Sequence, residues 1–247
     1  MNDLNEKRMQ VLGAPIDDWA MEEVVKWCES AIQQRKQQVI VTLNAHSHWC
    51  AFHDARMMQV IKRADLVVPE YGMYWAAKQT GKPLSHFVLG IELMKELLQM
   101  ASQKNFKIFL LGSRQAVLEA LFIELNQRYP NLKMHGHNGY FKKDEEASIL
   151  LEINVQKPDM LFVAMGTPRQ EVWIAEHSDD LQVPIAIGVG GSFDVLARMR
   201  KDTPSWARGH GFEWLYRTIQ DPGTYLKRYL TVNSWLVFQV LKEILRR

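Results

Sequence analysis

The chain has 247 residues, 47% of them hydrophobic, and a formal net charge of +2 at pH 7. This length and apolar fraction are enough for a large core, so the chain is expected to be globular rather than disordered. Two cysteines without a C-x-x-C motif offer no disulfide framework, and the polar first residues lead into no apolar stretch. We therefore expect no signal peptide and a cytoplasmic protein.

Short apolar runs alternate with helical patterns along the first 200 residues. Strands are expected at 39–43, 66–68, 108–111, 132–135, 160–165 and 184–189, and helices at 74–80, 91–104, 115–128 and 144–155, with another ending near 63. This alternation predicts right-handed βαβ units and therefore an α/β, Rossmann-like fold, with a mostly parallel sheet and helices on both of its faces. We expect a domain over 1–200 and a helical appendage over 201–247.

Polar and glycine-rich turns follow the predicted strands. They are Asn44, Glu70, Gly112-Ser113-Arg114, 166–171 and 188–194. Ligands of open parallel sheets bind beyond the carboxyl ends of the strands, so these turns predict one binding rim. Neither G-x-G-x-x-G nor G-x-x-x-x-G-K-[ST] occurs, and the expected site is therefore a different nucleotide or anion site.

The segment 159–171 joins a buried strand to a helix through Gly166. We expect Thr167 to cap the helix, Pro168 to be its first residue and Gln170 to complete a capping box. Free N–H groups at such a helix start bind anions, but the same residues also suit an ordinary well-capped turn. The residues of this segment leave both interpretations open.

Several segments together resemble the WecG/TagA/CpsF family of bacterial glycosyltransferases. The resemblance is carried by Val11-Leu-Gly-Ala-Pro-Ile-Asp17, Val41-Thr-Leu-Asn44, Ala64-Asp-Leu-Val-Val-Pro69, Gly81-Lys-Pro83, Phe109-Leu-Leu-Gly112, Gly139-Tyr-Phe141, Val163-Ala-Met-Gly-Thr-Pro-Arg-Gln-Glu171, Ile187-Gly-Val-Gly-Gly-Ser-Phe-Asp-Val195 and Glu213-Trp-Leu-Tyr-Arg217. It spans nearly the whole chain, and the order of the motifs is more specific than any one of them.

The resemblance implies transfer of an N-acetylhexosamine-type or related sugar from a UDP-sugar to a lipid-linked pyrophosphoryl acceptor in surface polysaccharide biosynthesis. It implies inversion at the anomeric carbon and neither an essential metal nor a cofactor. Such a reaction needs a carboxylate as base and hydrogen-bond donors for the departing diphosphate. No D-x-D triplet occurs, so backbone N–H groups and Arg169 are expected to hold the diphosphate.

The chain departs from the family pattern at Glu70, Tyr71 and Phe87, and Thr224 stands where another arginine is common. Family members usually follow Val-Val-Pro with Asp-Gly, whereas this chain has Glu70 and Tyr71. Glu70 is expected to supply the carboxylate base, and the alternative is a surface residue capping the next helix. Phe87 stands where many members have an arginine. Asp65 competes with Glu70, but it lies at the amino end of the same strand, about 15 Å from the rim.

The remaining candidates divide into two groups. Thr42 and Asn44 resemble the floor of the family's active site, although Thr42 also suits a strand and Asn44 a helix cap. The candidates for substrate binding are Gly112, Gly166, Thr167, Arg169, Gln170, Glu171, Gly190, Gly191 and Asp194. The histidines, His46, His48 and His53 among them, lack the spacing of metal ligands, so no metal site is expected.

The basic tail carries ten Lys/Arg and four Asp/Glu from Arg198 to Arg247. We expect one helix before 221 and a second over 225–247, too short in its uncharged part to cross a bilayer of about 30 Å. Aromatic and basic residues predict a helix lying on an anionic membrane, and the resemblance assigns Arg217, Lys227 and Arg228 to the lipid-linked acceptor. The alternative is packing against the main domain or a neighbouring subunit of a homo-oligomer.

Two other functions stay open at this point. The altered segment around Glu70 and Tyr71 would suit a non-catalytic sugar-nucleotide-binding relative, and the sheet alone would suit a NAD(P)-dependent oxidoreductase whose glycine fingerprint is missing. Nucleic acid is not an expected partner, because the basic residues sit among aliphatic ones rather than on a polar stripe.

Overall fold

The structure is a computed structural model that describes residues 7–204, 206–207 and 209–246. The first six residues, on which the absence of a signal peptide is predicted, lie outside the described residues, as do 205, 208 and 247.

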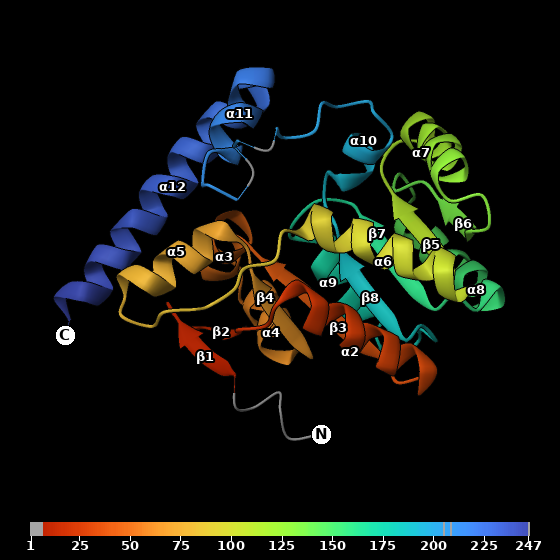
Figure 1. Cartoon of the computed structure of the whole chain (residues 1–247), viewed down its shortest axis with the longest axis horizontal. Helices are drawn as coiled ribbons and strands as arrows, with labels where there is room; N and C mark the ends of the chain where they lie inside the picture. The colour runs from red at the N-terminus through yellow and green to blue at the C-terminus, as the bar shows by residue number, and fades with distance from the viewer. Residues whose placement is uncertain (1–6, 205, 208, 247) are drawn as a thin grey trace.

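Six parallel strands form the central sheet, in the order β4-β3-β8-β7-β5-β6 (Figure 1). Their bounds are β3 Gln38–Leu43, β4 Leu66–Pro69, β5 Lys107–Gly112, β6 Lys133–His137, β7 Met160–Ala164 and β8 Ile185–Gly188. All residues of β4, β7 and β8 are buried, as expected for parallel strands that are covered on both faces. The predicted α/β class is confirmed.

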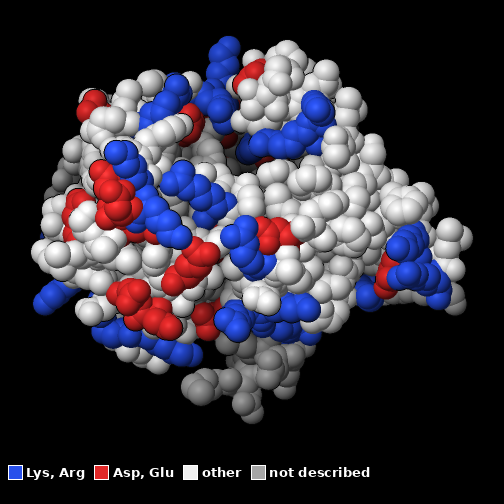
Figure 2. Space-filling model, turned by 180° about the vertical axis from the view of Figure 1, so that it is seen from behind, with Lys and Arg blue, Asp and Glu red and all other residues white. Residues whose placement is uncertain are grey.

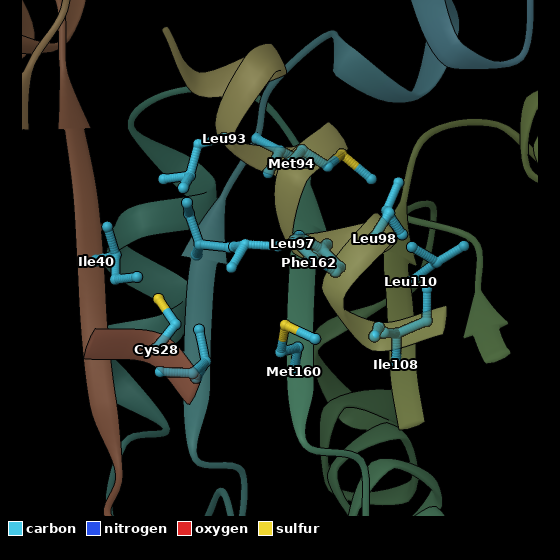
Figure 3. Packing of buried hydrophobic residues seen from close by; sticks show 14 of the residues in the cluster. Cys28, Ile40, Leu93, Met94, Leu97, Leu98, Ile108, Leu110, Met160 and Phe162 are labelled. Atoms are coloured by element: carbon cyan, nitrogen blue, oxygen red, sulfur yellow. The ribbon is translucent and has the colours of Figure 1, made fainter. Parts of the chain in front are cut away.

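Helices cover both faces of the sheet. One face packs against α2 (Met21–Gln33), α6 (Gly90–Lys104), α7 (Gln115–Arg128) and the short α10 (Ser192–Leu196). The other packs against α3 (Ala45–His53), α4 (Ala55–Arg63), α5 (Tyr71–Gln79), α8 (Glu146–Gln156, preceded by the 3-10 turn η1, Lys143–Glu145) and α9 (Arg169–Glu176). Figure 3 shows Leu97 of α6 lying against the sheet near Phe162.

Strand alternation explains how one sheet serves two cores. Ile40 faces the layer of α2 and α6, while its neighbour Val41 faces the opposite layer. In β7, Phe162 and Val163 divide in the same way. Successive side chains of a strand point to opposite faces, so a continuous apolar run fills both cores.

An amino-terminal hairpin and the helix after it are absent from the sequence prediction. Strands β1 (Arg8–Val11) and β2 (Ala14–Asp17) pair antiparallel. Asp17 is fully buried, and its two oxygens accept hydrogen bonds from the Arg8 guanidinium, each at 2.7 Å. Its Oδ2 also accepts the N–H of Val67 at 2.7 Å, which fastens the hairpin to β4. Four-residue strands give too little alternation to be found by pattern.

The helix expected to end near residue 63 is two helices. Asp54 separates α3 from α4, and its Oδ1 accepts the N–H of Arg56 at 2.9 Å. An aspartate at this place caps the second helix and satisfies a donor that has no partner within the helix.

The tail consists of α11 (Glu213–Gln220) and the long α12 (Pro222–Leu245), joined at Asp221, whose Oδ1 accepts the N–H of Thr224 at 3.1 Å. Helix α12 runs along α3 and α5 (Figure 1). Its residues Leu236 and Val240 belong to the same buried cluster as Leu43 of the sheet. The tail therefore packs on the main domain, and the boundary at residue 200 stays a prediction.

Helix α12 also exposes many large apolar residues. They are Leu226, Leu230, Val237, Phe238, Leu241, Ile244 and Leu245, with exposed Lys227 and Lys242 at the two ends of this stretch. On the face seen from behind, basic and acidic residues are mixed over much of the surface. A broad area without charged residues lies between them and the charged tip of the tail (Figure 2). Over the described part of the chain, no helix is both long and apolar enough to span a membrane.

Candidate active site

A cleft of about 110 Å³ opens at the carboxyl ends of β3, β4 and β8. It is bounded by the start of α6 on one side and by α11 on the other. The predicted site residues that line it are Thr42, Asn44, Glu70, Thr167, Gln170, Glu171, Gly190, Gly191 and Arg217. Residues from four strand ends and the tail thus meet in one place, as the rule for open parallel sheets requires.

Glu70 follows β4 and stands at the N-cap of α5, but its side chain does not cap that helix. Its Oε1 instead accepts the N–H of Gly90, the first residue of α6, at 3.1 Å. Burial and the nearby carboxylate of Glu213 raise the pKa of Glu70 to about 7, against the opposing effects of the Gly90 N–H and of Arg217. A carboxylate of this pKa suits a general base at neutral pH.

Asn44 fulfils the helix-cap interpretation. Its Oδ1 accepts the N–H of Ser47 at 2.9 Å, while Ser47 Oγ accepts the N–H of Asn44 at 2.8 Å. It also forms a side-chain hydrogen bond with Glu70, which favours the ionised carboxylate. Thr42 lies at the same end of β3, and a Cβ at Gly90 would lie 3.1 Å from both Thr42 Oγ1 and Glu70 Oε1. Gly90 therefore leaves room for these two side chains.

The expected capping box at Thr167 is wrong. Helix α9 begins at Arg169, with Pro168 at the N-cap and without a side-chain cap. Thr167 Oγ1 instead donates to Glu171 Oε1 at 2.9 Å. The proline occupies the cap position itself, which displaces Thr167 from it and frees its hydroxyl for Glu171.

Gln170 connects two strand ends. Its Oε1 accepts the N–H groups of Gly166 at 3.1 Å and Gly190 at 3.0 Å, and its Nε2 donates to Glu171 Oε1 at 2.8 Å. A Cβ at Gly188 would lie 2.6 Å from the same Nε2. The side chain is buried, and its carbonyl oxygen is fully occupied by the protein. Gln170 therefore holds the turns after β7 and β8 together.

Glu171 is the second buried carboxyl group of the cleft. Burial raises its pKa, opposed by the hydrogen bonds from Gln170 and Thr167. Both of these bonds reach Oε1, and Oε2 is buried without a partner among the described residues. A buried carboxyl oxygen without a partner favours the protonated state of the group.

Four other predicted substrate-binding residues do not line the cleft. Arg169 is exposed, with its guanidinium carbon 5.4 Å from the centre of the Phe141 ring, and Gly166 is exposed beside it. Asp194 Oδ2 accepts a hydrogen bond from Ser113 Oγ at 3.4 Å. Gly112 has φ +136°, and a Cβ there would collide with the backbone of Ala164. Its glycine thus has a packing reason, the close approach of β5 to β7.

Arg217 is the one of the three predicted acceptor residues that lines the cleft. Burial opposes its charge, but Tyr229, Glu213 and Glu70 raise its pKa, so the guanidinium stays charged. Arg217 Nη2 lies 3.6 Å from Glu213 Oε2, one helical turn away. The other two predicted acceptor residues lie elsewhere. Lys227 is exposed, and Arg228 stacks on Tyr225 and Tyr229, with 4.6 and 5.2 Å to the ring centres.

Four charged residues of the cleft were missed from the sequence: Arg200, Lys201, Asp202 and Glu213. A Cβ at Gly191 would lie 3.1 Å from Arg200 Nη1, so this guanidinium covers the glycine turn. The Arg200 guanidinium carbon also lies 5.5 Å from the centre of the Tyr225 ring of α12. The basic residues within 198–201 could have indicated an anion site in the sequence. That this segment folds back over the glycine turn is a tertiary feature, which a local pattern does not show.

Two of the histidines of α3 contact backbone carbonyl oxygens. His48 Nε2 lies 3.1 Å from the carbonyl oxygen of Leu12, and His53 Nδ1 lies 2.7 Å from that of Trp49. Among the described residues, no group of three or more His, Cys, Asp or Glu side chains could hold a metal ion.

A parallel α/β sheet with a carboxylate, basic groups and a glycine turn gathered beyond its strands suits an enzyme that catalyses group transfer. The chain belongs to the glycosyl transferase WecG/TagA/CpsF family, whose model matches residues 9–247. The resemblance found in the sequence is thereby confirmed, and the protein is a glycosyltransferase.

Relatives of known activity support this assignment. The chain is 34% identical over 220 residues to an N-acetylglucosaminyldiphosphoundecaprenol N-acetyl-beta-D-mannosaminyltransferase of Staphylococcus aureus (strain MW2), covering 88% of this chain and 86% of the relative. The same identity and coverage relate it to the enzyme of the same name from Staphylococcus aureus (strain NCTC 8325 / PS 47).

Proposed function

We propose that the protein is an inverting, metal-independent transferase that moves an N-acetylhexosamine, N-acetylmannosamine in the first instance, from a UDP-sugar to N-acetylglucosamine on a polyprenyl diphosphate. The sugar and the acceptor follow the names of the Staphylococcus aureus relatives. The product would enter the biosynthesis of a cell-surface polymer.

The observation that carries this proposal is the position of Glu70. Its carboxylate lies in the cleft beyond β4, with Arg217 of the tail near enough to lower its pKa. In an inverting transfer, a base removes the proton of the acceptor hydroxyl while the oxygen attacks the anomeric carbon and the C–O bond to UDP breaks. Glu70 takes that proton, and Thr42 and Asn44 orient the carboxylate and the hydroxyl.

The departing diphosphate needs positive charge and hydrogen-bond donors. Arg200 lies over the turn at Gly190 and Gly191, where backbone N–H groups in a glycine turn favour an anion. We assign Arg169, Gly166, Gly112 and Asp194, which follow or end neighbouring strands outside the cleft, to the nucleotide part of the donor. These groups stabilise the leaving UDP without a metal ion.

The acceptor is a membrane lipid, and the tail provides the surface for it. We assign Arg217, Lys227 and Arg228 to its diphosphate, and the exposed apolar side of α12 to an anionic bilayer. The protein would thus work as a peripheral protein at the cytoplasmic face of the plasma membrane.

The test is a transfer assay with purified protein, a UDP-sugar and N-acetylglucosamine on a short-chain lipid diphosphate. UDP-N-acetylmannosamine is expected to give UDP and a disaccharide lipid only when both substrates are present, in EDTA as well as without it. Proton NMR of the product would report inversion. A requirement for added Mn²⁺ or Mg²⁺ would contradict the metal-independent scheme, and retention of configuration would contradict a single base-assisted displacement.

A further inference from the structure

Three aromatic rings form a cluster beside the cleft. Tyr71 and Phe87 meet edge to face with ring centres 5.7 Å apart and an angle of 87°. Tyr74 completes the cluster at 6.3 Å from Tyr71 and 5.3 Å from Phe87. All three side chains are half-buried.

The segment that leads into α11 lies on two of these rings. A Cβ at Gly211 would stand 2.5 Å from Tyr71 Cε1, and a Cβ at Gly209 would stand 3.3 Å from Phe87 Cζ. Both glycines have positive φ, +81° and +69°. Each ring therefore fills the space that a side chain of the segment would need, and glycine permits both the close contact and the backbone conformation.

These contacts join the two sides of the cleft. Tyr71 directly follows Glu70, and Phe87 lies three residues before Gly90, the hydrogen-bond partner of Glu70. On the other side, Gly211 lies two residues before α11, which carries Glu213 and Arg217 into the cleft. The contact of Tyr71 with Gly211 therefore links the segment that carries Glu70 to the segment that carries Arg217.

We propose that Tyr71 and Phe87 are positioning residues that hold α11 over the cleft and act through Arg217. The inference rests on the proposed roles of Glu70 and Arg217. The packing of these two aromatic rings against the two glycines sets the distance between α11 and Glu70, and it adds no charge to the cleft. Loss of the Tyr71 ring would let α11 shift, and a displacement of about 1 Å of a reacting or binding group can cost on the order of a hundredfold in rate.

A double-mutant cycle tests the route through Arg217. Tyr71→Ala is expected to lower kcat in the transfer assay about 10- to 100-fold, while UDP affinity by calorimetry changes less than about twofold. Tyr71→Phe keeps the ring and should restore most of the rate. In an Arg217→Ala background, Tyr71→Ala should cost less than about threefold more, because the residue through which it acts is gone. If the two substitutions lower kcat independently, so that their fold losses multiply in the double variant, the proposal is overturned.

Tyr74→Ala is the matched comparison, because Tyr74 packs with both rings but is not among the atoms nearest to either of the two glycines. It should cost no more than about a third as much rate as Tyr71→Ala. Equal losses would assign the effect to the packing of the cluster and overturn a direct role of the contacts with the glycines.

Hydrogen exchange measured without substrate separates this inference from the proposed reaction. In Tyr71→Ala and Phe87→Ala, peptides covering α11 should exchange at least about tenfold faster, while peptides of α6 and α7 keep the wild-type rate. Unchanged protection of α11 would overturn the positioning role even if transfer is observed. If α11 exchanges faster in the variants but the wild-type protein catalyses no transfer, the positioning role stands and the proposed reaction is refuted.

Discussion

The carboxylate of Glu70 and the backbone N–H of Gly90 are 3.1 Å apart, so the acid that follows β4 is hydrogen-bonded to the first residue of α6. The positive end of a helix favours a carboxylate, yet burial and Glu213 prevail and raise the pKa of Glu70 to about 7. With a pKa of about 7, a substantial fraction of Glu70 is ionised at neutral pH, and the ionised carboxylate is basic enough to accept a proton.

Glu70→Gln should remove the base while keeping an oxygen for Gly90. We expect kcat to fall about 100- to 10,000-fold with UDP affinity nearly unchanged. The wild-type rate should rise with pH through about 7, since the base must be ionised, and the residual rate of the variant should lack this limb. Asp65→Asn is the control, because Asp65 Oδ2 accepts the N–H of Val39 at 2.8 Å, away from the cleft. Loss of turnover in a folded Asp65→Asn with normal turnover in Glu70→Gln would refute the assignment.

The same substitution should change stability in a pH-dependent way. The pKa of Glu70 is raised from its ordinary value of 4.5 to about 7 in the folded protein. Between these two pH values the folded protein retains a proton at Glu70 that the unfolded chain has released. The free energy of unfolding therefore falls as the pH rises through this range. Glu70→Gln removes the penalty. Its Tm should exceed that of the wild type at pH 8, by about 2–4 °C per kcal/mol, and match it near pH 4. The exposed Glu96→Gln should show no such trend, and a pH-independent difference would contradict the raised pKa.

UDP should bind at the turns after β7 and β8. Arg169→Ala combined with Gln170→Ala is expected to weaken UDP binding in calorimetry at least about tenfold, because the charge beside the turn and the bridge between Gly166 and Gly190 are both lost. Arg128→Ala removes an exposed arginine that lies at Tyr129, and its affinity should equal that of the wild type. An unchanged affinity in a folded double variant would exclude this site.

The outward side of α12 should bind anionic vesicles. Truncation after Asp221 should lower co-sedimentation, but it would also uncover the core at Leu236 and Val240. Leu230→Ser with Phe238→Ser and Leu241→Ser changes only exposed residues, and it should lower co-sedimentation severalfold at unchanged Tm. Salt should weaken wild-type binding, since each basic residue near the surface contributes about 1 kcal/mol. Equal co-sedimentation of this variant and the wild type would leave α12 a packing helix.

The sequence pattern predicts the long elements well because buried strands are continuous apolar runs and the long helices have clear boundary residues around apolar positions at helical spacing. The continuous run of β7 and the Arg128 end of α7 both fall where the sequence predicts them. The hairpin of β1 and β2 was missed because each strand has four residues and Pro15 interrupts one of them. The break at Asp54 was missed because helical periodicity continues through it.

The candidate site was predictable to the extent that it consists of strand ends. Glu70 and Asn44 follow strands, and topology alone brings them together. Arg200 and Glu213 reach the cleft through segments that fold back from beyond α10, and no local pattern contains that path. The contact between Tyr71 and Gly211 has the same origin, since 140 positions separate the two residues in the sequence.

Both native thiols lie inside the protein. Burial raises the pKa of Cys28 to about 12 and that of Cys50 to about 11, so neither forms a thiolate readily at neutral pH. A cysteine introduced at exposed Leu245 would then be alkylated selectively without first removing the native ones. A polarity-sensitive dye attached there would report, on a single chain, whether the end of α12 enters a lipid environment when acceptor-bearing vesicles are added.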